Sequence, residues 1–177
     1  MDKSAFELGR VHQLLEPGPV LLLATAGTQR PNVMTLSWQT MVAFDPPLVA
    51  CVLSARDFSF AALQRDGECT LNIPGAELAS QVVGCGNCSG RDTDKFTAFG
   101  LTPRPAERVA APLIDECDAS LECRVVDSGM VARYGMFIVE VVRAWRRGNG
   151  PERMLHHAGW GVFRVSEETL RLPSAMR

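Results

Sequence analysis

The chain has 177 residues, with 18 Lys and Arg against 20 Asp and Glu, and a formal net charge of −2 at pH 7. A nearly neutral chain without a basic run argues against nucleic acid or an anionic membrane as a partner. The length fits a single domain over residues 1–177, which can bury a core without disulfides.

The sequence features that report on compartment favour the cytoplasm. No signal peptide is visible, and the longest apolar run, 20–24, is far too short to span a bilayer. We therefore expect reduced thiols at all six cysteines, of which four lie in apolar surroundings typical of small buried side chains. Those four are Cys51, Cys69, Cys117 and Cys123.

Hydrophobic periodicity predicts many short strands with helices between them. Strands are expected over 20–25, 32–38, 48–53, 68–73, 120–127, 136–145 and 160–165, and helices over 58–65, 76–83 and 92–99. Segment 6–15 fits either a short helix or a strand. Because the first three strands have no helix between them, parallel βαβ units are excluded. The pattern predicts a mainly β fold, an antiparallel barrel with inserted α-helices.

The strand expected over 32–38 alternates strictly between apolar and polar side chains. Such a strand usually buries its apolar face and exposes the other. Trp38 adds an apolar slab with one N–H, which would suit a planar ligand with a polar edge. On periodicity alone, an ordinary barrel strand with a core tryptophan is the favoured alternative. The apolar face carries Met34, Leu36 and Trp38, and the opposite face carries Val33, Thr35 and Ser37.

A second segment, 54–59, lies between an expected strand and an expected helix. A helix start offers unpaired backbone N–H groups and the positive end of a dipole, which together favour a phosphate. Arg56 could add a bidentate contact, and Ser54 and Ser59 could add hydroxyl donors. The alternative is that Asp57 or Ser59 caps the helix while Arg56 is solvated.

A third segment, 85–96, combines glycines with a cation at a helix start. Gly86 and Gly90 allow close backbone approach to a ligand. Asp92 or Thr93 can cap the helix that follows. Lys95 then lies in the first helical turn, an unusual place for a cation unless an anion is nearby. The alternative is a capped surface helix with a solvated lysine.

The spacing Cys85-x-x-Cys88 permits zinc or a redox dithiol, and both interpretations are disfavoured. Zinc needs two further ligands, and His156 and His157 are the only adjacent candidates. Because the sequence has no second Cys-x-x-Cys, we expect no metal. A dithiol usually sits at a helix N-terminus after a strand, and the flanking glycines make that context poor. Hydrolase, Rossmann and P-loop motifs are absent from the sequence.

Six short motifs follow one another in a specific order and spacing. They are Pro17-Gly-Pro-Val, Asn32-Val-Met-Thr-x-Ser-Trp38, Asp45-Pro-Pro, Asn72-Ile-Pro, Ser89-Gly-Arg-x-x-Asp-Lys-Phe96 and Ala111-Pro-Leu-Ile. In this order the chain resembles the flavin reductase-like FMN-binding proteins, and among them the flavoredoxins, over about residues 14–142.

The resemblance implies an FMN-binding split barrel with Greek-key topology, and a homodimer with FMN near the subunit interface. It implies an FMN-dependent oxidoreductase in which NAD(P)H supplies hydride. The electrons would pass to free flavin, a metal complex or a partner protein. The alternatives are a non-enzymatic FMN electron carrier and a barrel that binds another ligand, such as haem or zinc. No catalytic side chain is assigned, because the cofactor carries the chemistry.

The resemblance also implies a set of cofactor contacts. Asn32, Thr35, Ser37 and Trp38 would line the ring and ribityl chain, and Ser54, Arg56 and Ser59 would surround the phosphate. Asn72 would lie near the flavin edge, and Ser89, Gly90, Arg91 and Lys95 would complete the site. Tyr134 occupies a place where the family often has histidine, and it can donate a hydrogen bond without being cationic at neutral pH. Trp160 and Phe163 are further expected contacts in the C-terminal segment.

Overall fold

The computed structural model describes residues 2–150, 153–166 and 168–169. Its main sheet has eight antiparallel strands, with hydrogen-bonded neighbours in the order β3-β2-β6-β9-β10-β5-β4 and β1 beside β10. The strands are β1 (Lys3–Phe6), β2 (Leu21–Thr25), β3 (Asn32–Leu36), β4 (Gln39–Phe44), β5 (Pro47–Val52), β6 (Glu68–Ile73), β9 (Ala119–Asp127) and β10 (Met136–Arg147). The predicted mainly β antiparallel fold is therefore confirmed.

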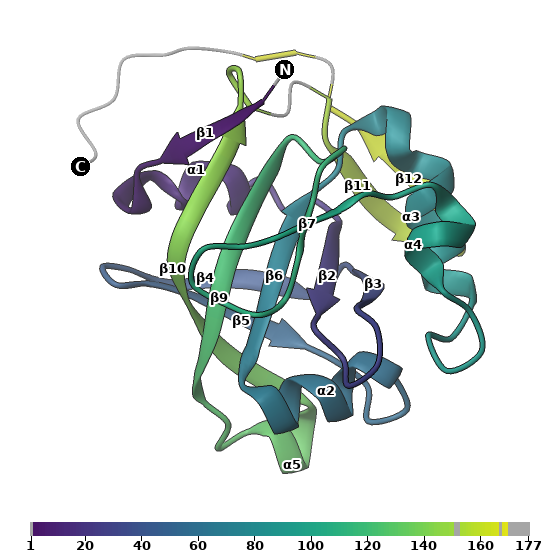
Figure 1. The fold of residues 1–177 in the computed structure, drawn as a ribbon. Helices are drawn as coiled ribbons and strands as arrows, with labels where there is room; N and C mark the ends of the chain where they lie inside the picture. Colours follow the sequence, from purple (N-terminus) through teal and green to yellow (C-terminus); the bar gives the residue numbers. More distant parts are fainter. Residues whose placement is uncertain (1, 151–152, 167, 170–177) are drawn as a thin grey trace.

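The long strand β10 lets the sheet curl around a core. Its first half pairs with β5 and most of its length pairs with β9, so it belongs to both halves of the sheet. Register shifts interrupt the β9–β10 pairing, and such bulges increase local twist and bending. Figure 1 shows the result, with β4 and β5 running across the strands β9, β6 and β2.

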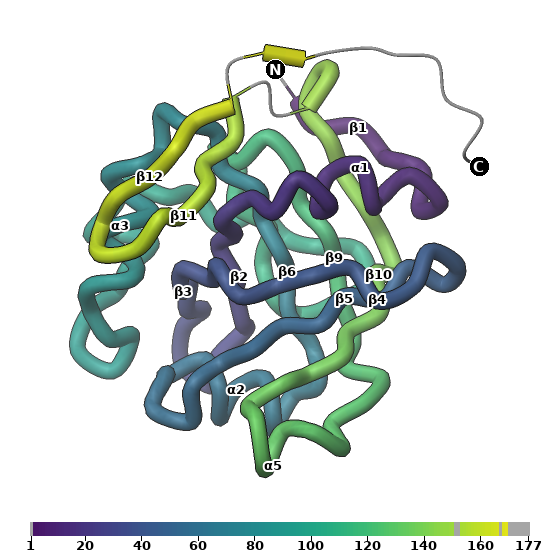
Figure 2. The backbone as a smooth tube through the Cα atoms, turned by 180° about the vertical axis from the view of Figure 1, so that it is seen from behind, coloured from purple at the N-terminus to yellow at the C-terminus, as the bar shows by residue number. Residues whose placement is uncertain are grey.

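The helices and small sheets lie around the main sheet. Figures 1 and 2 show α3, α4 and the β11–β12 hairpin on the same side of the molecule, beyond β3, and α2 at one end of the barrel. The helical segments are η1 (Leu8–Arg10), α1 (His12–Leu15), α2 (Phe58–Asp66), η2 (Ala76–Leu78), α3 (Ala79–Asn87), α4 (Lys95–Phe99) and α5 (Val131–Tyr134). The remaining strands are β7 (Pro103–Arg104), β8 (Leu113–Ile114), β11 (Leu155–Gly159) and β12 (Val162–Val165).

Two apolar clusters cover the two faces of β2. Leu21 and Leu23 belong to the cluster inside the barrel, whereas Leu22 and Ala24 pack in a second cluster with α3, α4 and β11. A strand that is buried on both faces has no polar face to show. This accounts for the continuous apolar run at 20–24, which contains no alternation.

The expectation for 32–38 is partly wrong. Met34 and Leu36 do face the barrel core, but β3 ends at Leu36 and the Trp38 side chain is 71% exposed. On the opposite face, Val33 is fully buried in the second cluster rather than exposed to solvent. The cause is the helical layer over this face, which alternation within one strand cannot reveal.

Several element boundaries also differ from the predictions. Segment 6–15, which was open, forms the end of β1 and two short helical turns, and β4 and β11 are strands that the periodicity missed. The helix expected over 76–83 continues to Asn87. The next helix begins at Lys95 with Asp94 as its cap, not Asp92 or Thr93, and Asp94 Oδ1 accepts from Thr97 N at 3.3 Å.

The expected end of α2 and the expected burial of four cysteines are confirmed. Helix α2 ends at Gly67, whose left-handed backbone, with φ of 65°, favours glycine. Cys51, Cys69, Cys117 and Cys123 are buried, and every cysteine is a free thiol. Among the described residues, no helix is long and apolar enough to cross a membrane.

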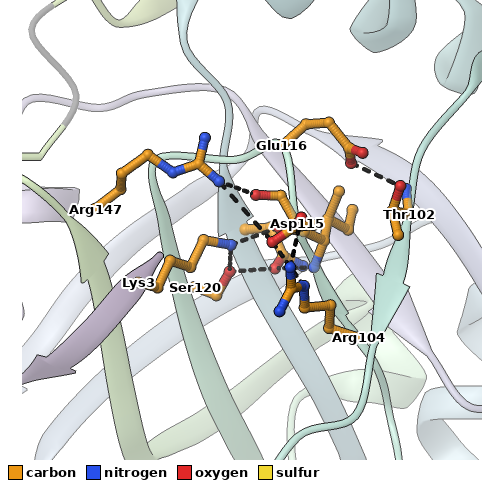
Figure 3. Close-up of polar contacts among 9 residues, drawn as sticks. Lys3, Thr102, Arg104, Asp115, Glu116, Ser120 and Arg147 are labelled. Atoms are coloured by element: carbon orange, nitrogen blue, oxygen red, sulfur yellow. Dashed lines mark hydrogen bonds and ion pairs between the residues drawn. The ribbon is translucent and has the colours of Figure 1, made fainter. Parts of the chain in front are cut away.

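A polar cluster fastens the N-terminal strand to the barrel (Figure 3). Lys3 donates from Nζ to the Ile114 carbonyl and to Ser120 Oγ, and Arg147 donates to the Asp115 carbonyl. Burial lowers the pKa of Lys3 to about 8, although neighbouring acidic groups oppose this shift. Because Lys3 belongs to β1 and Ser120 to β9, these contacts position the N-terminal strand on the barrel.

Candidate functional site

Three adjoining cavities form one groove along β3, and Thr35 lines all three. The inner cavity, about 280 Å³, lies between β3, the start of α2 and the loop after α3. The outer cavity, about 330 Å³, extends past Trp38 to Tyr134. The hairpin cavity, about 250 Å³, lies between α3 and β12 and is lined by His157 and Phe163.

The inner cavity unites three segments that are far apart in the sequence. Eight of the predicted cofactor contacts line it: Asn32, Thr35, Arg56, Ser59, Ser89, Gly90, Arg91 and Lys95. Thr35 is fixed by its hydroxyl, which donates to the Val82 carbonyl of α3 at 2.5 Å. Asn32 Nδ2 donates to Ser59 Oγ at 2.8 Å, which ties β3 to the first turn of α2. The fold therefore holds the strand, the helix start and the loop in one fixed arrangement.

The start of α2 has no side-chain cap. Asp57 is its N-cap residue, but Asp57 Oδ2 accepts from Ser54 N at 2.9 Å and not from an N–H group of the helix. Ser59 is 1% exposed and does not cap the helix either. The alternative therefore holds in part: Asp57 occupies the N-cap position and Arg56 is exposed, but neither Asp57 nor Ser59 gives the helix a side-chain cap. Uncapped N–H groups at a helix start favour a bound anion, and here they adjoin Arg56 in the cavity wall.

Lys95 is a buried cation without a buried counter-ion. Its side chain is 4% exposed, and Nζ donates to the Cys85 carbonyl at 2.7 Å. Within the described part of the chain, none of the ion pairs includes Lys95. Burial lowers its pKa, and the nearby thiols of Cys88 and Cys85 and the carboxylate of Asp57 oppose this. The alternative of a solvated surface lysine is therefore wrong.

Gly90 lines the inner cavity at a point where there is no room for a side chain. A Cβ atom there would lie 2.0 Å from Asn32 Oδ1 and 2.7 Å from Phe58 Cδ1. The Gly90 carbonyl accepts from Arg30 Nη2 at 3.3 Å. Arg91, next to it, places its guanidinium 5.6 Å from the centre of the Phe58 ring. The loop is thus packed directly against β3 and α2.

The remaining predicted contacts divide between the other cavities and positions outside them. Thr35, Ser37, Trp38, Ser54 and Tyr134 line the outer cavity, where Tyr134 is about half exposed. Phe163 lines the hairpin cavity. Trp160, at the turn between β11 and β12, is fully exposed and lines none of the three cavities.

The structure does not bring Asn72 to the groove. Its side chain is 0% exposed, and Nδ2 donates to the Leu22 carbonyl at 3.1 Å and to Thr70 Oγ1 at 2.9 Å. Oδ1 accepts from Ile114 N and Ser120 Oγ at 3.0 and 2.7 Å. A buried amide with both ends satisfied stabilises the sheet and has no group left for a cofactor. The expected contact with the flavin edge is therefore corrected.

Sequence reasoning missed several residues that line the groove. Phe58 and Asp57 lie within the segment expected to bind phosphate, and Asn87 lies within the glycine-rich segment. Their position in these two segments could have identified them as cavity residues. His157 lines the hairpin cavity and was considered only as a zinc ligand. Its neighbour His156 points elsewhere, with Nδ1 3.2 Å from the Gly18 carbonyl and Nε2 2.8 Å from Ser166 Oγ.

The groove has the chemistry that a flavin mononucleotide requires. The inner cavity gathers hydroxyls, backbone N–H groups and cations suited to an anionic group, and the outer cavity offers the Trp38 indole beside hydroxyls. Lys95 supports the fit independently, because a buried ammonium with one protein acceptor has donors left for an anionic ligand. Among the described residues, no group of three or more His, Cys, Asp or Glu side chains could hold a metal ion.

Curated relatives with detectable sequence similarity include proteins with and without an assigned activity. The chain is 30% identical over 175 residues to the uncharacterized protein YddH of Escherichia coli, covering 90% of this chain and 93% of the relative. It is 28% identical over 144 residues to the reductase component of a 4-nitrophenol 4-monooxygenase/4-nitrocatechol 2-monooxygenase of Rhodococcus opacus, covering 81% and 74%.

Solved structures share the fold over nearly the whole chain. An FMN-binding domain of a flavin reductases-like enzyme from Shewanella baltica superposes with a TM-score of 0.90 and 25% identity, covering 98% of this chain and 100% of that one. Flavoredoxin of Desulfovibrio vulgaris superposes with a TM-score of 0.80 and 25% identity, covering 89% and 91%. The expected FMN-binding split barrel is therefore confirmed.

The sequence profile of the flavin reductase like domain matches residues 14–164. This match includes β3, the start of α2 and the loop before α4, which together build the inner cavity. Membership of an FMN-binding family implies FMN as the cofactor. The chain belongs to the flavin reductase-like family.

Proposed function

We propose that this protein is an FMN-dependent oxidoreductase that accepts hydride from NAD(P)H and passes electrons to a flavin, a metal complex or a partner protein. The single observation that carries the proposal is the buried ammonium of Lys95 in the wall of the inner cavity. The reductase component from Rhodococcus opacus supports the reductase assignment by sequence similarity.

The electrostatics of Lys95 explain why an anion belongs in this cavity. Removing a charged group from water without a counter-ion is costly, and a buried charge is normally paired. Lys95 has one protein acceptor, the Cys85 carbonyl, and its lowered pKa reports the resulting destabilisation of the ammonium. An anionic ligand would supply the missing partner through a charge-assisted hydrogen bond.

The other residues have separate tasks in binding. Arg56, Ser59 and the uncapped start of α2 hold the phosphate group, while Ser54 stands at the neighbouring edge of the outer cavity. Thr35, Ser37 and Trp38 provide hydroxyls and an indole along the groove for the ring and ribityl chain. Lys95 stabilises the negative charge that the ring carries when it is reduced. Bound FMN supplies the hydride chemistry, and these residues supply position and polarity.

The proposal is tested by loading the protein with FMN and mixing it anaerobically with NADH or NADPH. Rapid loss of the flavin's visible absorbance is the expected result. A flavin that binds but is not bleached would overturn the reductase assignment in favour of an electron carrier. A purified protein that fails to bind FMN, or that shows a haem spectrum, would refute the cofactor assignment.

We also propose that the protein acts as a cytoplasmic homodimer with FMN near the interface. The edge strand β4 supports a partner copy, because Val42 and Phe44 on it are 52% and 58% exposed. Exposed apolar side chains on an edge strand favour protein contacts. The free cysteines fit a reducing compartment, where thiols stay unpaired. Analytical ultracentrifugation of the FMN-loaded protein tests the dimer, and a monomer would refute it.

A further inference from the structure

We propose that Cys85 and Cys88 form a second two-electron redox centre, a dithiol that exchanges electrons with the flavin held in the inner cavity. The inference rests on the proposed FMN site and adds a reactive pair to it. Both cysteines line the same cavity as Asn32, Arg56 and Lys95. The sequence context alone disfavoured a dithiol, and the tertiary structure supplies what that context lacked.

The two thiols are brought together by the end of α3. Cys85 lies in the last turn of the helix, and Cys88 is the residue that ends it, with extended backbone angles of φ −131° and ψ 161°. Cys88 Sγ donates to the Gly84 carbonyl at 3.3 Å, so its side chain folds back over that turn, beside Cys85. Residues three apart on a helix are neighbours, and both cysteines line the inner cavity.

Burial divides the two cysteines into an inner and an outer member. Cys85 is 1% exposed, whereas Cys88 is half-buried and reaches the cavity from the loop side. Burial raises the pKa of the Cys85 thiol to about 11, and the nearby Lys95 ammonium opposes this rise. The cation thus limits, without cancelling, the cost of forming the thiolate, which is the form that reacts in thiol–disulfide chemistry. It takes the place that a helix N-terminus occupies in other dithiol centres.

The remaining cysteines lack this setting. Cys69 and Cys123 lie opposite each other in the β6–β9 pairing, and Cys51 belongs to the same apolar cluster inside the barrel. None of these three cysteines lines a cavity of the groove, and neither does Cys117, the fourth remaining cysteine. The Cys85–Cys88 pair alone, among the described thiols, combines a close neighbour, a cation and access to the cofactor cavity.

The proposed step is balanced as a two-electron exchange. The S–H bonds of Cys85 and Cys88 are broken, one S–S bond forms between them, and two electrons pass to oxidised flavin. One of the two released protons goes to the reduced ring and the other goes to solvent. The reverse step uses reduced flavin to open the disulfide. A disulfide formed and opened during turnover is compatible with a reducing compartment.

The test counts electrons. FMN-loaded protein is oxidised with diamide, freed of the reagent, and titrated anaerobically with dithionite. The wild type should take up four electrons per flavin, two for the flavin and two for the disulfide. Cys88→Ser should take up two. The matched control Cys69→Ala removes a thiol from the other neighbouring pair and should keep the count at four.

A second measurement reads out the disulfide directly and does not depend on FMN binding by a variant. Peptide mapping of the oxidised wild-type chain should find Cys85 and Cys88 protected from alkylation, and the peptide that contains both should be lighter by two hydrogen atoms than its reduced form. Equal electron counts in wild type and Cys88→Ser, or free thiols at both positions after oxidation, would overturn the dithiol. Failure of the wild-type protein to bind FMN would instead overturn the proposed function. It would also overturn the electron exchange between the dithiol and the flavin, even if the disulfide forms.

Discussion

Replacing Lys95 with methionine should change cofactor affinity and protein stability in opposite directions. Methionine has a similar length and no charge, so it fills the site beside Cys85 without an ammonium. The substitution removes a charge-assisted hydrogen bond from the ammonium to bound FMN, worth about 1.5–3 kcal/mol. FMN affinity should therefore fall by roughly 10- to 150-fold.

The ligand-free protein should respond differently to the same substitution. Without a ligand, the buried Lys95 ammonium has the Cys85 carbonyl as its acceptor, and its lowered pKa shows that folding disfavours the charged form. Methionine removes this penalty together with a hydrogen bond worth about 1 kcal/mol. The free energy of unfolding of the ligand-free variant should stay equal to that of the wild type or rise by up to about 1 kcal/mol.

The assay pairs an FMN titration, followed by quenching of flavin fluorescence, with urea unfolding of the ligand-free protein. Lys3→Met is the matched control, because Lys3 is the other lysine of the chain and lies in the polar cluster at β1. It should leave FMN affinity unchanged, because Lys3 lines none of the three cavities of the groove. Unchanged FMN affinity in Lys95→Met, or a loss of stability as large as that of affinity, would refute the role of Lys95.

Three further predictions follow from the same contacts. Gly90→Ala should weaken FMN binding at least tenfold in a titration, because the new Cβ would meet Asn32 Oδ1 at 2.0 Å; wild-type affinity would contradict the packing. Between about pH 8 and 10.5 Lys3 is protonated in the unfolded chain and neutral in the folded protein. The contribution of Lys3 to the free energy of unfolding therefore rises with pH over this range. Urea unfolding at several pH values should show this rise, up to about 1.4 kcal/mol per pH unit. In Lys3→Met the slope of the free energy of unfolding against pH should be smaller by that amount, and equal slopes in the two proteins would refute the prediction. Phe44→Lys should place a charge on the exposed face of β4 and shift the FMN-loaded protein toward monomer in ultracentrifugation, whereas an unchanged dimer would place the interface elsewhere.

The candidate site was predictable where one short segment carried its own signal. The segment 54–59 was singled out because a strand leads into a helix there, and the structure places Arg56 and Ser59 in the inner cavity. Lys95 was singled out as a misplaced cation, and the structure shows it buried. Asn72 failed because its motif gives no sign that four partners from neighbouring segments would surround its amide.

By itself, the sequence determined the mainly β antiparallel fold, the end of α2 at Gly67 and the family, because these depend on local periodicity, turn residues and motif order. The tertiary structure alone decided which side chains share a cavity. Val33 is buried because helices cover the outer face of β3, and Cys88 shares a cavity with Lys95 because α3 and α4 pack on the same strand. Such contacts join segments tens of residues apart, and no pattern within either segment specifies them.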